Sequence, residues 1–175
     1  MISPERLRFY PFFGNFPHKN LLQLADMAEE MIVHPGDIIF QEGQEIDHIY
    51  LIESGAVGLS IAIPLQDKEH SLSDQLTGEL ETEEIVISAL DRGDVFGWSG
   101  LIPPHISTAT ARALTQCHLL AFDCNELRDA FREDCRFGYI MLLKIGQVIR
   151  GRFEDLHMEL LADKVAVQTA ARAHA

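Results

Sequence analysis

The chain has 175 residues, of which 47% are hydrophobic and 23% charged, and its formal net charge at pH 7 is −13. This length allows one domain with a substantial core, and the composition excludes extensive disorder and a collagen-like repeat. The negative charge argues against direct binding to nucleic acid, because such binding requires basic side chains that neutralise phosphates. We therefore expect one globular domain over residues 1–168 that binds neither DNA nor RNA.

The sequence shows no sign of export or of membrane attachment. Its longest apolar runs are far shorter than the roughly twenty residues needed to cross a bilayer, and the N-terminus is charged where a signal peptide would be apolar. The three cysteines form no C-x-x-C pair, which suits a reducing compartment. These features predict a cytoplasmic protein with no membrane partner and with unpaired thiols at Cys117, Cys124 and Cys135.

Residues 1–34 are predicted to form N-terminal helices. Ser3 followed by Pro4 is typical of a helix start, and an apolar stripe near helical spacing runs from Leu21 to Ile32. The segment His34-Pro35-Gly36-Asp37 predicts a turn, because proline presets φ and glycine permits positive φ. After this turn the apolar period changes from helical to two.

Residues 35–123 are predicted to form a β-roll, a double-stranded β-helix of the jelly-roll or cupin-like kind. Short β-branched or aromatic runs alternate with turn residues here, and no helical segments separate them. The residues between Pro64 and Glu84 are mostly polar and acidic, and we expect them to form a hairpin extension. The predicted strands are Ile38–Phe40, Ile49–Ile52, Val57–Ile63, Ile85–Leu90, Thr110–Leu114 and Cys117–Phe122.

Residues 124–168 are predicted to be helical again, with Asn125 as a cap, a long helix from about Gly138 to Val167, and a frayed tail over 169–175. Apolar residues in the long helix recur in two rows with the spacing of a two-stranded seam. We expect this seam to form a homodimer, although a helix packed on its own roll would also explain the rows. The candidate interface residues are Leu142, Ile149, Phe153, Leu156 and Leu160.

Three segments carry a resemblance to a known family. Residues 34–55 contain a proline-glycine turn, a second glycine turn, an aspartate, an aromatic residue and a serine-glycine pair, and related stretches follow at 90–97 and 108–113. Over about residues 5–160 the chain thus resembles the cyclic nucleotide-binding domain family, and in particular the sensory domain of catabolite-activator-type regulators. The resemblance implies a regulatory domain that is not an enzyme and has no cofactor.

Such regulators carry a DNA-binding helix-turn-helix after their long helix, and too few residues follow Leu161 for this module. The resemblance is therefore to the sensory half alone, which would act through dimerisation or through a protein partner.

The family binds its ligand with a phosphate cassette that follows Phe96 and Gly97. In the family a glutamate holds the ribose hydroxyl and an arginine pairs with the phosphate. Here Trp98 occupies the glutamate position and Ser107 the arginine position. We therefore expect cyclic nucleotides to bind weakly, if the pocket binds a small molecule at all.

The candidate pocket residues are those of this degenerate cassette and of the loop that follows it. Trp98 would either stack on a flat ligand or fill the space of a lost one. His105 would either supply partial positive charge or lie in solvent. The full set of candidates is Gly97, Trp98, Ser99, Gly100, Leu101, His105, Ser107, Thr108 and Ala109.

Two other functions remain open. One is a cyclic nucleotide-binding signalling protein with an atypical pocket. The other is a cupin-like enzyme, since cupins share the β-roll, but the eight histidines contain no H-x-H pair of the kind that binds metal in cupins. We therefore predict no catalytic and no metal-binding residues.

Overall fold

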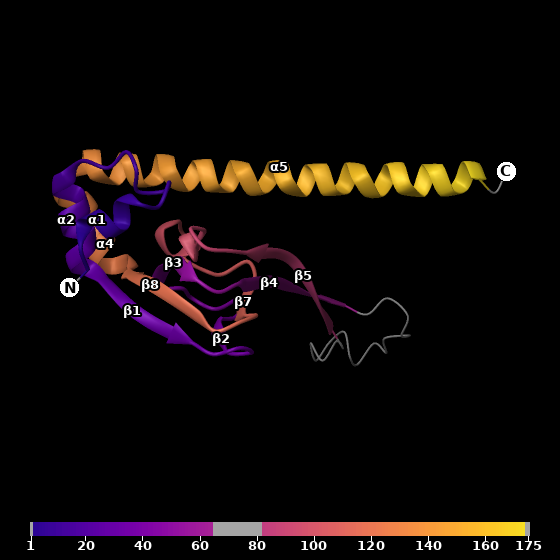
Figure 1. Ribbon diagram of the computed structural model, residues 1–175, viewed down its shortest axis with the longest axis horizontal. Coiled ribbons are helices and arrows are strands. Elements are labelled where there is room, and N and C mark those ends of the chain that lie inside the picture. Colours follow the sequence, from indigo (N-terminus) through magenta and orange to yellow (C-terminus); the bar gives the residue numbers. More distant parts are fainter. Residues whose placement is uncertain (1, 65–81, 174–175) are drawn as a thin grey trace.

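The computed structural model describes residues 2–64 and 82–173, which form a β-roll of two four-stranded sheets beneath a long helix (Figure 1). This confirms the predicted mainly β architecture with flanking helices. The strand order is β1-β8-β3-β6 in one sheet and β2-β7-β4-β5 in the other. The elements are α1 (Pro4–Arg8), α2 (His18–Met27), β1 (Ala28–Val33), β2 (Ile38–Phe40), β3 (His48–Ser54), β4 (Val57–Pro64), β5 (Thr82–Leu90), β6 (Val95–Phe96), the 3-10 turn η1 (Trp98–Leu101), β7 (Thr110–Ala113), β8 (Cys117–Asp123), α4 (Cys124–Glu133) and α5 (Cys135–Ala173).

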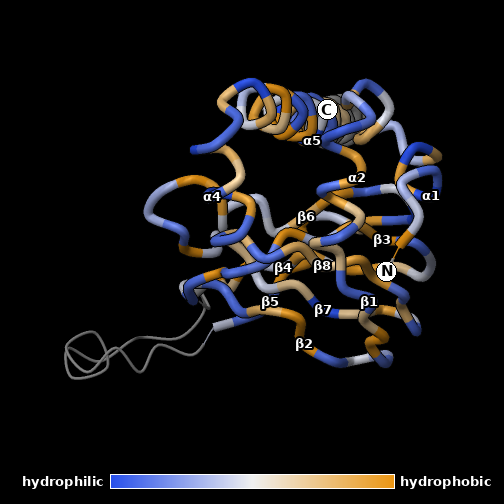
Figure 2. The backbone as a smooth tube through the Cα atoms, turned by 90° about the vertical axis from the view of Figure 1, so that its left-hand side faces the viewer, coloured by the Kyte–Doolittle hydropathy of each residue, from blue (hydrophilic) through white to orange (hydrophobic). Residues whose placement is uncertain are grey.

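The two central strands of the first sheet, β3 and β8, are buried on both faces. In β3, Leu51 packs into a core shared with the helices, while the next residue, Ile52, packs into the core between the two sheets. Leu120 and Leu119 of β8 divide in the same way. This follows from the period of two in a strand, and it explains why these strands are apolar throughout. Figure 2 shows hydrophobic residues concentrated on the strands of the roll.

Helix α5 joins the helix-side core through one stripe near its start. Phe137, Met141 and Ile145 are each at most 1% exposed and recur every four residues. Ile149 continues the stripe and is half-buried. Beyond it the helix runs over the roll and past β4 and β5 (Figure 1). Among the described residues, no helix has the length and apolar character that crossing a bilayer would require.

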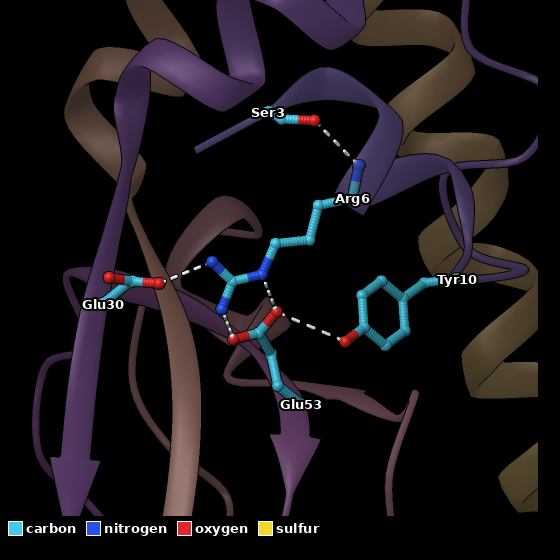
Figure 3. Close-up of polar contacts among 5 residues, drawn as sticks. All are labelled: Ser3, Arg6, Tyr10, Glu30 and Glu53. Atoms are coloured by element: carbon cyan, nitrogen blue, oxygen red, sulfur yellow. Dashed lines mark hydrogen bonds and ion pairs between the residues drawn. The ribbon is translucent and has the colours of Figure 1, made fainter. Parts of the chain in front are cut away.

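An ion-pair network attaches α1 to the first sheet (Figure 3). Arg6 donates from Nε to Glu53 on β3 at 2.8 Å and from Nη1 to Glu30 on β1 at 2.6 Å, and Tyr10 also donates to Glu53 at 3.3 Å. A forked guanidinium–carboxylate contact of this kind fixes orientation as well as distance. The network therefore holds the N-terminal helix against two strands through residues that lie 24 and 47 positions from Arg6 in the sequence.

The predicted helical region 1–34 is too long, because α2 ends at Met27 and the chain then pairs as β1 with β8. The buried residues of α2 include Leu21, Leu24 and Ala25, whereas Ile32 is 57% exposed on an edge strand. The apolar stripe was thus helical only in its first half. Pairing with β8 determines the structure of the second half, which sequence periodicity alone did not reveal.

Other predicted boundaries also move. Strand β5 begins at Thr82, so Glu83 and Glu84 belong to the strand and not to the acidic extension, whose remaining part, 65–81, lies outside the described residues. Asp123, not Asn125, caps α4, because its carboxylate accepts the backbone N–H groups at 125 and 126. Helix α5 begins at Cys135 and continues to Ala173, so residues 169–173 are helical instead of frayed.

Candidate functional site

The cassette begins with a glycine that the fold requires. Gly97 follows β6 with φ of 79°, and a Cβ placed on it would lie 2.7 Å from the carbonyl oxygen of His48. Both features exclude a larger side chain without movement of the backbone. This close approach starts the single turn η1, which places Trp98 beside the roll.

Ser107, at the position of the family arginine, is only 4% exposed. Its hydroxyl donates to the carbonyl oxygen of Ala109 and accepts from the backbone N–H of the same residue at 3.2 Å. The hydroxyl thus serves the backbone of its own loop and is not free to bind a ligand.

Two neighbouring cavities adjoin the cassette. The smaller, of about 40 Å³, lies within it and has room for about one water molecule. The larger, of about 670 Å³, lies between α5, the hairpin of β4 and β5, and the cassette. Trp98, Thr108, Ala109, Leu59 and Arg152 line both. The other residues of the larger cavity are Val86, Ile87, Ser88, Ala89, Ile149, Phe153, Asp155 and Leu156.

The structure brings together part of the predicted pocket. Gly97, Ser99 and Ser107 line only the smaller cavity. Gly100 and Leu101 line neither of the two cavities, because they are buried, and the backbone of Gly100 packs against Ile46 and Cys124.

His105, the other predicted pocket candidate of this loop, does not line either of the two cavities. Its Nδ1 is 3.5 Å from Nη1 of Arg128, which donates at 2.6 Å to the carbonyl oxygen of Gly100. His105 thus lies next to a side chain of α4.

Arg152 of α5 is a residue lining both cavities that the sequence analysis missed. Its Nη2 donates at 2.8 Å to the carbonyl oxygen of Val95, and burial lowers the pKa of its guanidinium, which the negative charge of Asp94 partly offsets. A signal was present in the sequence. Arg152 continues the buried stripe that ends at Ile149, and an arginine on the buried face of a helix is uncommon.

The predicted interface residues divide between this cavity and the outer face of α5. Ile149, Phe153 and Leu156 line the larger cavity, and Phe153 and Leu156 are nevertheless 67% and 43% exposed. Leu142 and Leu160 are 51% and 63% exposed and line neither of the two cavities. The helix wall of the cavity is therefore part of the predicted seam.

Within the described residues, no three His, Cys, Asp or Glu side chains come together as a metal site would require. His48 pairs with Asp47 at 2.7 Å and lies near Tyr50, whose pKa burial raises to about 12. Burial likewise raises the pKa of Cys124 to about 12. A neutral, buried thiol of this kind is a poor nucleophile and a poor metal ligand.

The cassette and the long helix thus enclose a cavity at one side of the β-roll. Residues 30–134 match the model of the family described as the cyclic nucleotide-binding domain, and the chain belongs to this family. The family is regulatory and not catalytic.

Solved structures of other chains share this fold. A crystallised chain from Geobacter metallireducens GS-15, described as a candidate cyclic nucleotide-binding protein, is 26% identical, with a TM-score of 0.69 over 87% of this chain and 99% of that chain. The catabolite activator protein of Thermus thermophilus is 20% identical, with a TM-score of 0.61 over 87% and 63%. The regulatory subunit of a cAMP-independent protein kinase A from Trypanosoma brucei is 19% identical, with a TM-score of 0.62 over 88% and 48%.

Proposed function

We propose that this chain is a regulatory domain that senses a small molecule in the cavity beneath α5 and catalyses no reaction. The supporting observation is that the cavity takes its walls from both the cassette and the long helix. A molecule bound there would contact α5 directly, so its binding energy would favour one position of the helix over others. The volume of about 670 Å³ suits a small organic ligand.

Cyclic AMP and cyclic GMP fit the cassette poorly. The smaller cavity, of about 40 Å³, cannot hold a phosphate group, and Ser107 supplies no charge to it. A charge-assisted hydrogen bond contributes about 1.5–3 kcal/mol, so its loss weakens binding about tenfold to a hundredfold. We expect dissociation constants above roughly 100 μM for both nucleotides.

Isothermal calorimetry at pH 7 tests this expectation directly. Micromolar affinity for either nucleotide would contradict it and would identify a cyclic nucleotide signalling domain with an atypical pocket. In that case, loss of the affinity in an Arg152→Gln variant would show that the helix supplies the charge that the cassette lacks.

We also propose that the domain acts as a homodimer paired through α5. Exposed apolar side chains recur along one face of the helix at the spacing of a two-stranded seam, and four of them, Leu142, Phe153, Leu156 and Leu160, are between 43% and 67% exposed. Exposed apolar area of this extent is uncommon on a monomer. Phe153 and Leu156 belong to the seam and to the cavity, so ligand binding and pairing would be coupled.

A further inference from the structure

The surroundings of Arg152 are unusual for a charged side chain. Its guanidinium is largely withdrawn from solvent at the junction of the two cavities, and its one hydrogen bond within the described residues goes to the carbonyl oxygen of Val95. No carboxylate of the described residues lies within 4.0 Å of it, although Asp94 is close enough to act through its charge. Buried arginines normally pair with an anion.

A guanidinium has more N–H donors than one carbonyl can use. No buried side-chain nitrogen of the described residues lacks a partner, so the donors of Arg152 that make no hydrogen bond are accessible to solvent, and Arg152 lines both cavities. Cavity walls of low polarity, such as those formed by Leu59, Ile87 and Ile149, strengthen an ion pair made there. The position is therefore suited to a negatively charged group on a ligand.

The rest of the cavity selects the shape of that ligand. Trp98 contributes the one tryptophan of the chain to the wall and lines both cavities together with Arg152. An indole presents a flat, apolar face, on which planar rings pack in offset or edge-on geometry. An aromatic ring therefore matches the wall next to the guanidinium.

We propose that the cavity binds a planar aromatic molecule other than a cyclic nucleotide, whose single anionic group pairs with the guanidinium of Arg152 while its ring packs against Trp98. This inference rests on the proposed function, because it specifies the class of ligand that the same cavity senses. It differs from recognition by the cassette, since the charge that holds the ligand comes from α5.

A substitution at Asp155 should change anion binding in the opposite direction from a substitution at Arg152. It also lines the cavity and is exposed, so its carboxylate is hydrated and repels an anion only weakly. Replacing Asp155 with Asn should strengthen anion binding by a small factor, about twofold to threefold. If the cavity instead binds a cation, Arg152→Gln should strengthen ligand binding and Asp155→Asn should weaken it.

The test compares two fluorescent probes that share one ring system. 8-Anilinonaphthalene-1-sulfonate carries a single negative charge, and N-phenyl-1-naphthylamine carries none. We expect wild-type protein to bind the sulfonate more tightly than the neutral probe, and Arg152→Gln to weaken sulfonate binding about tenfold to a hundredfold while leaving the neutral probe within twofold. Quenching of Trp98 emission reports contact with the cavity wall.

Arg150→Gln is the matched control. Arg150 lies two residues away, which is about 200° around the helix, and it pairs with Glu154 at 2.8 Å in solvent. This variant makes the same change in net charge and should leave both probes unaffected. Ala89→Phe narrows the cavity from an exposed position on β5 and should weaken both probes.

Two results would overturn the inference, and they separate it from the proposed function. If both probes bind equally and Arg152→Gln changes neither, the cavity binds ligands without selecting for charge, and ligand sensing remains. If neither probe binds and Trp98 emission stays constant, both the ligand class and ligand sensing in this cavity are wrong. Circular dichroism of each variant establishes that it is folded.

Discussion

Ser107 and Trp98, which the family resemblance places at the two charged positions of the cassette, have different surroundings in the structure. The hydroxyl of Ser107 is satisfied by Ala109 inside its own loop, so the position is structurally complete without a ligand. Trp98 instead becomes part of a wall, and the space beside it remains open toward α5. Positive charge is thus absent from the cassette but present across the cavity, at Arg152. The larger of the two cavities thus lies on the helix side of the cassette.

Restoring the two family residues should restore the family ligand. We expect the double replacement Trp98→Glu with Ser107→Arg to bind cyclic AMP with measurable affinity, because the carboxylate can accept from the ribose and the guanidinium can pair with the phosphate. Either single replacement should gain about tenfold or less. Calorimetry on the three variants measures the gain. No binding by a folded double variant would show that the indole is not what closes the nucleotide space.

Gly97 should be more sensitive to substitution than any exposed glycine of the helix. Gly97→Ala combines a positive φ with a Cβ 2.7 Å from the carbonyl of His48, so it should destabilise the domain by about 1–3 kcal/mol. Gly146→Ala adds a Cβ in open space within α5 and should stabilise it by about 0.5–1 kcal/mol. Urea unfolding of both variants measures the opposite signs. Equal effects would contradict the strained geometry at Gly97.

At the scale of elements, sequence patterns predicted the strands whose apolar residues are buried in a core. The alternation in β4 identified a strand because one of its faces packs into the core between the sheets, and the apolar runs of β3 and β8 did so because both of their faces pack into cores. Strand β1 was missed because its residues are exposed except at Val33 and Ala28, so pairing with β8 and not burial makes it a strand. The cavity wall from α5 could not be predicted, since it depends on how the helix lies over the roll.

The cap of α4 was predicted two residues too late, at Asn125 instead of Asp123, and this difference can be tested. Asp123 accepts the N–H groups of Glu126 and Asn125, so Asp123→Ala should cost about 1 kcal/mol at pH 7. Asn125→Ala should cost less, because Asn125 is exposed and its side chain accepts from Arg128 instead of from the backbone N–H groups of the helix start. Thermal unfolding of the two variants ranks the caps. A larger loss of stability in Asn125→Ala than in Asp123→Ala would contradict Asp123 as the cap.

The same cap has a defined pH dependence. Hydrogen bonds from the backbone of Glu126 and then Asn125 lower the pKa of Asp123 in the folded state. The unfolded state therefore binds the proton more tightly, so the stabilisation by the cap is complete above the ordinary carboxyl pKa and is lost as the pH falls through the folded value. The difference between wild type and Asp123→Ala should shrink below about pH 4. A difference that stays constant into acid would show that the carboxylate is not the capping group.

At the scale of the whole molecule, the proposed seam would couple dimer formation to the proposed ligand binding. Leu156 and Phe153 have exposed surface for a partner helix, yet they also line the larger cavity. A second copy of α5 on this face would cover the side of the cavity that the first leaves open. Dimer formation would then strengthen ligand binding, and ligand binding would strengthen dimer formation, because the coupling between two sites is reciprocal.

Leu156→Asp tests pairing and coupling together, since it would bury an unpaired charge in the seam. We expect wild-type protein at micromolar concentration to show twice the monomer mass in light scattering, and Leu156→Asp to shift this toward the monomer. Met158→Asp is the matched control, because Met158 is exposed on the same helix about 200° away from Leu156. A monomeric wild type, or equal effects of the two variants, would contradict a dimer through this face. If Met158→Asp stays dimeric and Leu156→Asp does not, the wild-type protein should also bind the sulfonate probe more weakly after dilution below the dimer midpoint. The reason is that separation of the two copies would uncover the cavity wall at Phe153 and Leu156.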